Sequence, residues 1–284
     1  MFTDDAVTPV RLEILIDLLR KSRSNLARED VYRLLQPEGL KPDAHLAPSK
    51  ATVRAALDLD LAEEAQGGLS LSAFCKKKKD TRSAILSAFD EKALANTETE
   101  KYFGLFYSYY LGLGKAVYSR ARYSGDEWAE QFNKDVFSGE TQSNPFNRTK
   151  LTGIHRWLNY VGMGWYDPEG NFQANPYDRV LRALPTIFSN VRKLSSGEFM
   201  NQLARTCPEL DGGEMFRQAN QNWKSEDKQC TLGLSHALIE LHEDGIILLD
   251  CPADCQEWSL KEAEPPRDDH FKGDRFASIE WRKK

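Results

Sequence analysis

The sequence contains little that would suit a membrane-spanning or secreted protein. Its uninterrupted apolar stretches are all shorter than ten residues, whereas a transmembrane helix needs about 20. The first residues, MFTDDAVTP, have neither the basic segment nor the apolar segment of a secretory signal. We therefore expect a cytoplasmic protein without contact to a membrane.

Cysteine and histidine are also scarce. The five cysteines are Cys75, Cys207, Cys230, Cys251 and Cys255. An odd number of cysteines without a secretory signal indicates reduced thiols. Cys251 and Cys255 are separated by three residues, which matches neither the C-x2-C redox motif nor the spacing of common zinc sites. The nearest histidines, His236 and His242, are six residues apart and would lie on different faces of a helix. We expect no metal site and no cofactor.

The chain has no excess of positive charge. With 38 basic and 43 acidic side chains its net charge is −5, which excludes a protein that coats DNA nonspecifically. The charge is unevenly distributed, however: residues 75–150 sum to +3 and residues 191–284 to −5. Between residues 141 and 166 there is no acidic side chain. A local contact with DNA is therefore compatible with the composition.

The hydrophobic pattern predicts a winged-helix module over residues 1–75. Thr8 and Pro9 are typical of a helix start, and leucines at helical spacing follow to about residue 21. A second helix is expected over residues 27–35 and a third from Ser49, a good cap. Two short apolar runs then flank Gly67 and Gly68, a turn that is common in hairpins.

The same order of helices and strands predicts further modules. We expect a helical linker domain over residues 76–140, a second winged-helix-like module over residues 141–190 and a third over residues 191–284. With 40% hydrophobic residues the chain has enough apolar material for these cores. The predicted fold class is mainly α with small β-hairpins (α+β), built as tandem winged-helix modules around a helical middle.

Motifs of known enzymes fail at specific positions. The segment from Gly112 to Ala116 resembles part of a phosphate-binding loop but lacks the Ser or Thr that binds magnesium. His242 and Glu243 have no second histidine at the spacing of a zinc protease, and no G-x-S-x-G occurs. We expect no catalytic residues and no enzyme activity; the open alternative is a nuclease site assembled from distant residues.

Nucleic-acid contact is the chemistry that the sequence supports best. In the first module it involves the start of the third helix and the lysine run after the hairpin; in the second it involves the acid-free helix. Hydroxyl, amide and cationic side chains at such positions bind phosphates and base edges. The candidates are Ser49, Lys50, Thr52, Arg54, Lys76, Lys77, Lys78, Lys79, Asn147, Arg148, Lys150, Thr152, His155 and Arg156.

Each candidate also has a purely structural interpretation. Ser49 could serve only as a helix cap, and the lysine run could be a solvated linker. The segment from Tyr102 to Tyr123 combines aromatics and cations, as in surfaces that stack single-stranded bases, but its spacing favours a packed core. In the last module, Glu240 and Glu243 on the expected third helix favour docking of a protein over DNA.

The segments LEILIDLLRK and SKATVRAALDLDL near the N-terminus, with LSHALIELHEDGIILLD and DRFASIEW near the C-terminus, resemble the DpdG-type accessory proteins. These belong to bacterial clusters that insert 7-deazaguanine bases into DNA and restrict foreign DNA. The resemblance implies a role in DNA modification or antiviral defence beside separate enzyme subunits. It provides no catalytic residues that could be transferred to this chain.

Taken with the residues, this favours a non-catalytic DNA-binding adaptor in a bacterial DNA-modification or anti-phage defence system. Its expected partners are double-stranded DNA and, through the last module, protein subunits of the same system. Two alternatives stay open. One is a transcriptional regulator or plasmid replication initiator, and the other is a protein–protein scaffold subunit of a multi-subunit DNA-processing complex.

Overall fold

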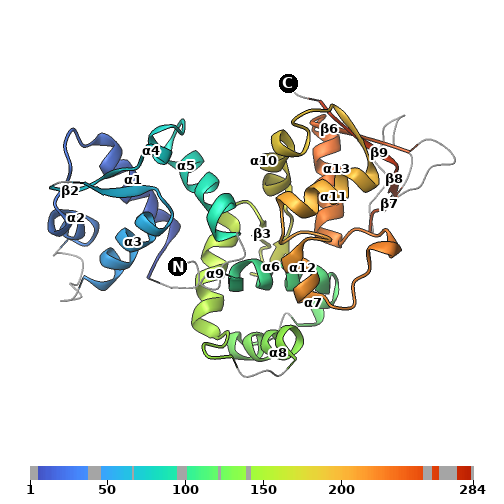
Figure 1. The fold of residues 1–284 in the computed structure, drawn as a ribbon. Coiled ribbons are helices and arrows are strands. Elements are labelled where there is room, and N and C mark those ends of the chain that lie inside the picture. Colours follow the sequence, from blue (N-terminus) through green and yellow to red (C-terminus); the bar gives the residue numbers. More distant parts are fainter. Residues whose placement is uncertain are drawn as a thin grey trace. The chain divides into compact units, whose positions relative to one another are not determined.

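A computed structural model gives the fold of the chain (Figure 1). It describes residues 6–37, 46–65, 67–94, 101–120, 123–138, 142–251, 258–261 and 274–282. The chain is mainly helical with small antiparallel sheets, which confirms the predicted α+β class. Along the described parts of the chain, no helix combines the length and the apolar character that crossing a membrane requires.

The chain divides into two compact units. The N-terminal unit consists of Met1–Phe103 and Asn147–Tyr160, and the C-terminal unit consists of Gly104–Phe146 and Val161–Lys284. Their charges differ: the N-terminal unit has 19 basic and 17 acidic side chains, a net charge of +2, and the C-terminal unit has 19 and 26, a net charge of −7. The negative charge of the whole protein therefore belongs to the C-terminal unit.

The N-terminal unit begins with three helices and a hairpin, in the order that the sequence predicts. Its elements are α1 (Pro9–Lys21), α2 (Arg28–Leu35), α3 (Ala47–Asp58), β1 (Ala62–Ala65), β2 (Gly68–Leu71), α4 (Ala73–Lys76), α5 (Thr81–Ala88), the π-helical turn η1 (Phe89–Ala93), the start of α6 (Lys101–Leu113) and α9 (Arg148–Tyr160). The assignment of these elements to a winged helix stays a prediction.

Local chemistry explains the helix start and the hairpin. The Thr8 hydroxyl accepts a hydrogen bond from the Arg11 backbone N–H at 3.3 Å, and Pro9 occupies the first position of α1. In the β1–β2 hairpin, Gly68 has φ +144°, and a Cβ there would lie 2.0 Å from the Leu26 carbonyl oxygen. Only glycine allows this close approach. Helix α3 starts at Ala47, so the prediction that it begins at Ser49 was two residues late.

Helix α9 is distant in sequence from α1 but packs in the same unit. The Trp157 indole is buried and donates to the Val7 carbonyl oxygen at 3.1 Å. The Tyr160 hydroxyl donates to the Glu13 carboxylate at 2.8 Å. The predicted second module combines α9 with the hairpin that follows it. The two elements fall in different compact units, and the four-module division of the chain stays a prediction.

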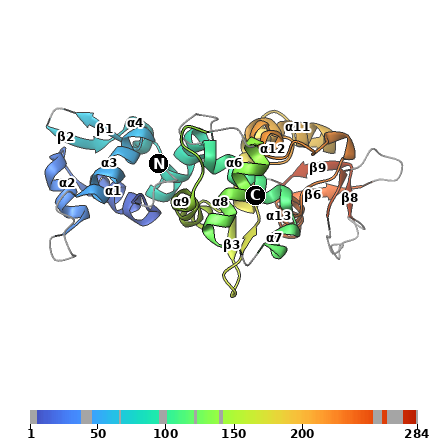
Figure 2. The same cartoon turned by 90° about the horizontal axis from the view of Figure 1, so that it is seen from below.

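The C-terminal unit combines helices with small antiparallel sheets. After the remainder of α6 it contains α7 (Ala116–Ser119), α8 (Gly125–Phe137), β3 (Gly164–Tyr166), β4 (Phe172–Ala174), α10 (Tyr177–Ile187), β5 (Lys193–Ser195), α11 (Ser196–Thr206), α12 (Glu214–Ala219), the 3-10 turn η2 (Ser225–Asp227), α13 (Leu232–Glu243), β6 (Ile247–Asp250), β7 (Trp258–Ser259), β8 (Arg275–Phe276) and β9 (Ser278–Trp281). Strand β9 lies between β5 and β6 and is antiparallel to both. Helices α11 and α13 contact this three-stranded sheet. Figure 2 shows β6 and β9 next to each other.

Aromatic side chains fill the core next to α6 and α8. Phe106 stacks on Phe146 with ring centroids 5.3 Å apart and lies 5.6 Å from Phe132. Phe103, Phe106, Tyr107, Tyr110 and Val117 are all buried, which confirms that this part of the Tyr102–Tyr123 segment is core. The segment nevertheless leaves Tyr118 and Tyr123 exposed.

A buried ion pair and free thiols complete the core. The Arg179 guanidinium lies 2.8 Å from the Glu209 carboxylate, with the side chains 4% and 0% exposed. The described cysteines are all free thiols, as the odd count predicts, and Cys255 lies outside the described residues.

Candidate nucleic-acid interface

Helix α9 presents a polar face without any acidic side chain. Its exposed positions include Arg148, Thr152, Arg156 and Asn159, spaced by four, four and three residues, so they form one stripe along the helix. The opposite side of α9 is buried through Leu151, Ile154, Trp157 and Leu158. The packing of the helix therefore fixes which side faces solvent, and that side carries cations and hydrogen-bonding groups only.

Two of the predicted α9 residues have structural roles. The Asn147 side-chain oxygen accepts from the Lys150 backbone N–H at 3.0 Å, which caps the start of the helix. The Lys150 side chain is buried, with its ammonium 4.7 Å from the centre of the Tyr102 ring. Burial lowers the pKa of Lys150. Its charge is directed at the ring and away from the exposed stripe.

His155 and Thr152 can form hydrogen bonds but add no charge. Burial lowers the pKa of His155 to about 4, so its imidazole is neutral at pH 7. The Thr152 hydroxyl is exposed and donates to the Arg148 carbonyl oxygen at 3.0 Å, which leaves its lone pairs available to a donor. The charge of this face comes from its arginines.

A shallow depression of about 490 Å³ lies at the C-terminal end of the stripe. It is lined by Thr8, Pro9 and Val10 from the start of α1, by Arg82 from α5, and by Arg156, Asn159 and Tyr160 from α9. The Arg82 guanidinium lies 4.9 Å from the centre of the Tyr160 ring and donates to the Tyr160 carbonyl oxygen at 3.2 Å. These contacts hold Arg82 beside Arg156, so two cations meet at one site.

Sequence analysis missed Arg82. It lies 78 residues from Tyr160 in the chain and follows Asp80, which caps α5 by accepting from the Ser83 N–H at 2.7 Å. In the sequence it lies three residues after Lys79 and is separated from the lysine run by Asp80 and Thr81. Only the packing of α5 beside α9 brings it to the basic stripe.

The candidates on α3 divide into buried hydroxyls and exposed cations. Ser49 is buried and donates to the Gln36 side chain at 3.4 Å, and Thr52 is buried and donates to the Pro48 carbonyl oxygen at 2.8 Å. Lys50 and Arg54 are exposed, and Arg54 pairs with Asp58 at 3.8 Å. Of the four candidates, the two cations reach the surface of α3.

The lysine run contains both paired and unpaired cations. Lys76 lies 3.4 Å from Glu63, and Lys78 lies 3.9 Å from Glu91 and 4.7 Å from the centre of the Phe74 ring. Lys77 and Lys79 are exposed and form no ion pair with any described residue. Half of the positive charge of this run is therefore already compensated within the protein.

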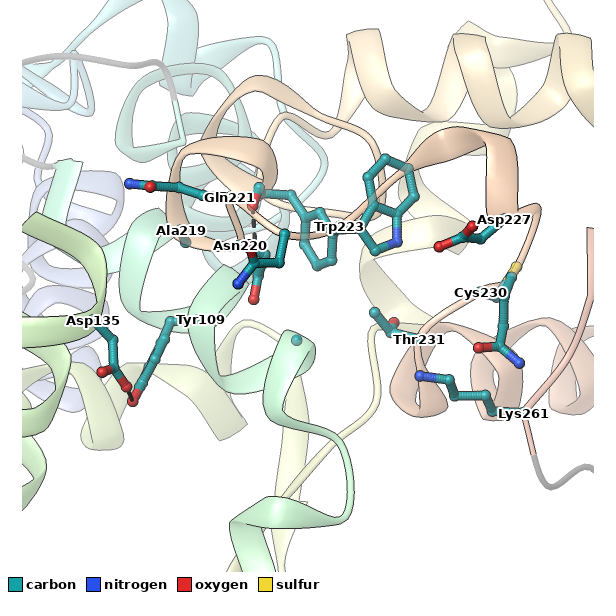
Figure 3. A pocket seen from close by; sticks show the side chains of 14 residues that line it. Tyr109, Asp135, Ala219, Asn220, Gln221, Trp223, Asp227, Cys230, Thr231 and Lys261 are labelled. Atoms are coloured by element: carbon teal, nitrogen blue, oxygen red, sulfur yellow. Dashed lines mark hydrogen bonds between the residues drawn. The ribbon is translucent and has the colours of Figure 1, made fainter. Parts of the chain in front are cut away.

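The C-terminal unit contains a separate polar pocket of about 510 Å³ (Figure 3). Tyr109 and Asp135 point towards each other on one side, where the Tyr109 hydroxyl donates to the Asp135 carboxylate at 2.6 Å, and Thr231 and Lys261 lie on the other side. Burial and the bond to Asp135 raise the pKa of Tyr109. A phenol in this state is protonated at neutral pH and is a poor nucleophile.

Asn220 in the wall of this pocket has a structural role. Asn220 donates to the Ser108 carbonyl oxygen at 2.8 Å, and a Cβ on Gly112 would lie 1.7 Å from the Asn220 side-chain oxygen. Within the described residues, no group of three His, Cys, Asp or Glu side chains gathers where it could hold a metal ion. The lining of the pocket combines amide and hydroxyl groups with Asp135, Asp227, Cys230 and Lys261.

All candidate residues named from the sequence lie in the N-terminal unit, the one with a positive net charge. The comparison with family models matches residues 2–255 to the model described as DpdG-like. The chain belongs to the DpdG-like family. The resemblance read from the sequence is therefore correct, and membership of the DpdG-like family connects the chain with a DNA-modification system. Searches of curated proteins and of solved structures found no match to this DpdG-like chain.

Proposed function

We propose that this DpdG-like protein is a non-catalytic adaptor that binds double-stranded DNA through its N-terminal unit. The contact surface, called here the basic face, consists of Arg148, Thr152, Arg156 and Asn159 on α9 together with Arg82 on α5. The observation that carries the proposal is the exposed, acid-free stripe of α9 with Arg82 beside its end.

The chemistry of the basic face suits phosphate. Arginine binds phosphate oxygens through two parallel N–H donors, and the Asn159 amide adds a further donor. Arg82 and Arg148 form no ion pair with any described residue, so phosphate would not have to displace a carboxylate from either. Lys50, Lys77 and Lys79, which are exposed in the same unit, can extend the contact.

The C-terminal unit supports the adaptor part of the proposal. Its net charge of −7 disfavours a broad DNA contact there, and we assign it the docking of protein subunits. Chemistry on DNA would then be carried out by the subunits that dock.

Binding of the full chain to a fluorescein-labelled duplex of about 30 base pairs tests the proposal. Arg82→Gln, Arg148→Gln and Arg156→Gln together should weaken binding at least tenfold. The matched control combines Arg205→Gln, Arg217→Gln and Lys224→Gln, three exposed cations of the C-terminal unit that form no ion pair with any described residue. The control removes the same charge and should change affinity less than twofold. Equal losses in the two variants, or no binding by the wild type, would overturn the proposal.

A further inference from the structure

A second pocket of the C-terminal unit, of about 310 Å³, has aromatic walls. We call it the aromatic pocket. It lies between the α6–α7 segment, the β3–β4 hairpin and the start of α13, and its lining includes Val117, Tyr118, Trp165, Phe172, Gln173 and His236. Its volume is at the lower end of the range for small-molecule sites, which suits one planar ring system.

Two aromatic side chains of this pocket remain exposed. Tyr118 is 51% exposed and Trp165 is 46% exposed. When a ligand covers the face of an aromatic side chain that is exposed beside a pocket, apolar surface is removed from water and the complex is stabilised. Indole and phenol rings of this kind stack on nucleobases in proteins that bind single strands.

The hairpin places a hydrogen-bonding group next to the indole. Trp165 and Gln173 are directly opposite each other in the antiparallel β3–β4 pair, so their side chains lie on the same face of the hairpin. A ring that stacks on Trp165 would therefore have its edge within reach of the Gln173 amide.

The Gln173 amide is held in one orientation. Its oxygen accepts from the Tyr118 hydroxyl at 2.9 Å, and its nitrogen donates to the Asp167 carboxylate at 2.9 Å. Asp167 is itself held by the Asn171 backbone N–H at 2.8 Å and by the Asn171 amide at 3.1 Å. Among the described residues, the second amide hydrogen and the second lone pair of Gln173 have no partner. An amide with one donor and one acceptor available matches the edge of a base.

The charge around the pocket admits a polyanion although the unit as a whole is acidic. None of the described residues that line the pocket is acidic. In the α6–α7 wall, Lys115 is exposed, whereas Arg120 pairs with Asp135 at 3.7 Å. Lys115 is therefore the cation of this wall that the phosphates flanking a bound base would meet, and the nearby carboxylate of Asp167 is held by Gln173 and Asn171.

From these observations we propose that the aromatic pocket binds an unstacked nucleobase of single-stranded DNA. The base stacks against Trp165 and Tyr118, and its edge bonds with Gln173. This activity goes beyond the binding of duplex DNA by the basic face, because the bases of a duplex are stacked on each other and cannot enter a pocket of this size.

The experiment measures binding of the full chain to labelled 12-nucleotide single strands of dA, dT and dC and, separately, to the duplex. Trp165→Ala should weaken binding to the single strands about 5- to 150-fold, the range for loss of one base–aromatic stack, and should leave duplex binding within twofold. Tyr123→Ala removes another exposed aromatic of the C-terminal unit that does not line the pocket, and serves as the control with affinity within twofold of wild type. Gln173→Met keeps the length of the side chain and should reduce the differences in affinity among the three strands.

Circular dichroism and thermal unfolding of each variant establish that it is folded, and Trp165→Phe, which retains a ring, should bind with intermediate affinity. No binding of single strands by the wild type, or equal affinity of wild type and Trp165→Ala, would overturn the proposal. The second result would mean that single strands bind elsewhere on the chain. Loss of duplex binding in the basic-face variant tests only the proposed function, so the two proposals can fail separately.

Discussion

The salt dependence of duplex binding gives the sharpest test of the basic face. Each DNA phosphate that a protein cation neutralises releases a counterion into solution. The logarithm of the association constant therefore falls linearly with the logarithm of the salt concentration, by about 0.9 per phosphate contact. Arg82, Arg148 and Arg156 supply three such contacts in the proposed interface. Replacing all three by glutamine should make the slope shallower by about 2.7.

The size of the effect between two salt concentrations follows directly. Raising salt fourfold, from about 50 to about 200 mM, should weaken wild-type binding about 40-fold more than it weakens binding of the triple variant. Each single variant should differ from wild type by about 3.5-fold over the same range. Fluorescence anisotropy titrations at four or more salt concentrations measure these slopes.

Lys150 provides a matched control on the same helix. Its charge lies buried over the Tyr102 ring, so Lys150→Met, which keeps the apolar stem, should leave the slope within about 0.3 of wild type if it contacts no phosphate. A slope that responds to Lys150→Met as strongly as to Arg148→Gln would refute the assignment of the contact to the exposed stripe. So would a triple variant whose slope equals that of the wild type.

Three predictions concern stability. Gly68→Ala should lower the free energy of unfolding by more than about 1 kcal/mol, because its Cβ would lie 2.0 Å from the Leu26 carbonyl oxygen. Gly197→Ala in α11 is the control and should not lower it, because no atom lies within 4 Å of the new Cβ. Thermal unfolding of the two variants measures the difference. Burial, opposed by hydrogen bonds from Thr231, raises the pKa of Asp211 from 3.8 to about 6. Between these two pH values the folded state binds more protons than the unfolded state, so the free energy of unfolding should fall by up to about 3 kcal/mol as pH rises. Urea unfolding measures this slope, which Asp211→Asn should abolish. Burial lowers the pKa of His155 from 6.5 to about 4. The free energy of unfolding should therefore fall by up to about 3 kcal/mol as pH drops from 6.5 to about 4, and His155→Gln should remove this loss. If the Asp211 and His155 variants keep the pH profile of the wild type, both assignments are wrong.

The sequence predicts local features of this fold well. Thr8 and Pro9 mark the start of α1, and the glycine pair marks the β1–β2 hairpin, because both depend on backbone geometry within a few residues. The predicted start of α3 was wrong because a tertiary contact determines the role of Ser49. Serine is a residue type that often caps helices, but the Ser49 hydroxyl is buried and donates to Gln36, and the residue that precedes the first turn is Leu46.

The site depends on packing that the sequence does not display. The absence of acids around α9 indicates a basic surface, but only the burial of Trp157 and Leu158 determines that Arg148 and Arg156 face solvent while Lys150 faces Tyr102. Arg82 enters the site through a contact across 78 residues of chain, and Gln173 is oriented by Tyr118 across 55 residues. Such distant pairs follow from the tertiary structure alone.

The two proposed contacts share a property that bears on how the protein would choose its target. Arginines on phosphates carry no sequence information, and stacking on Trp165 accepts any base because every base has a π face. The Gln173 amide reads one edge of one base, which distinguishes among four nucleotides at a single position. A protein with these contacts holds DNA but selects little of its sequence. In the proposed arrangement, selection of the site to be modified would come from subunits docked on the C-terminal unit, to which the adaptor presents DNA.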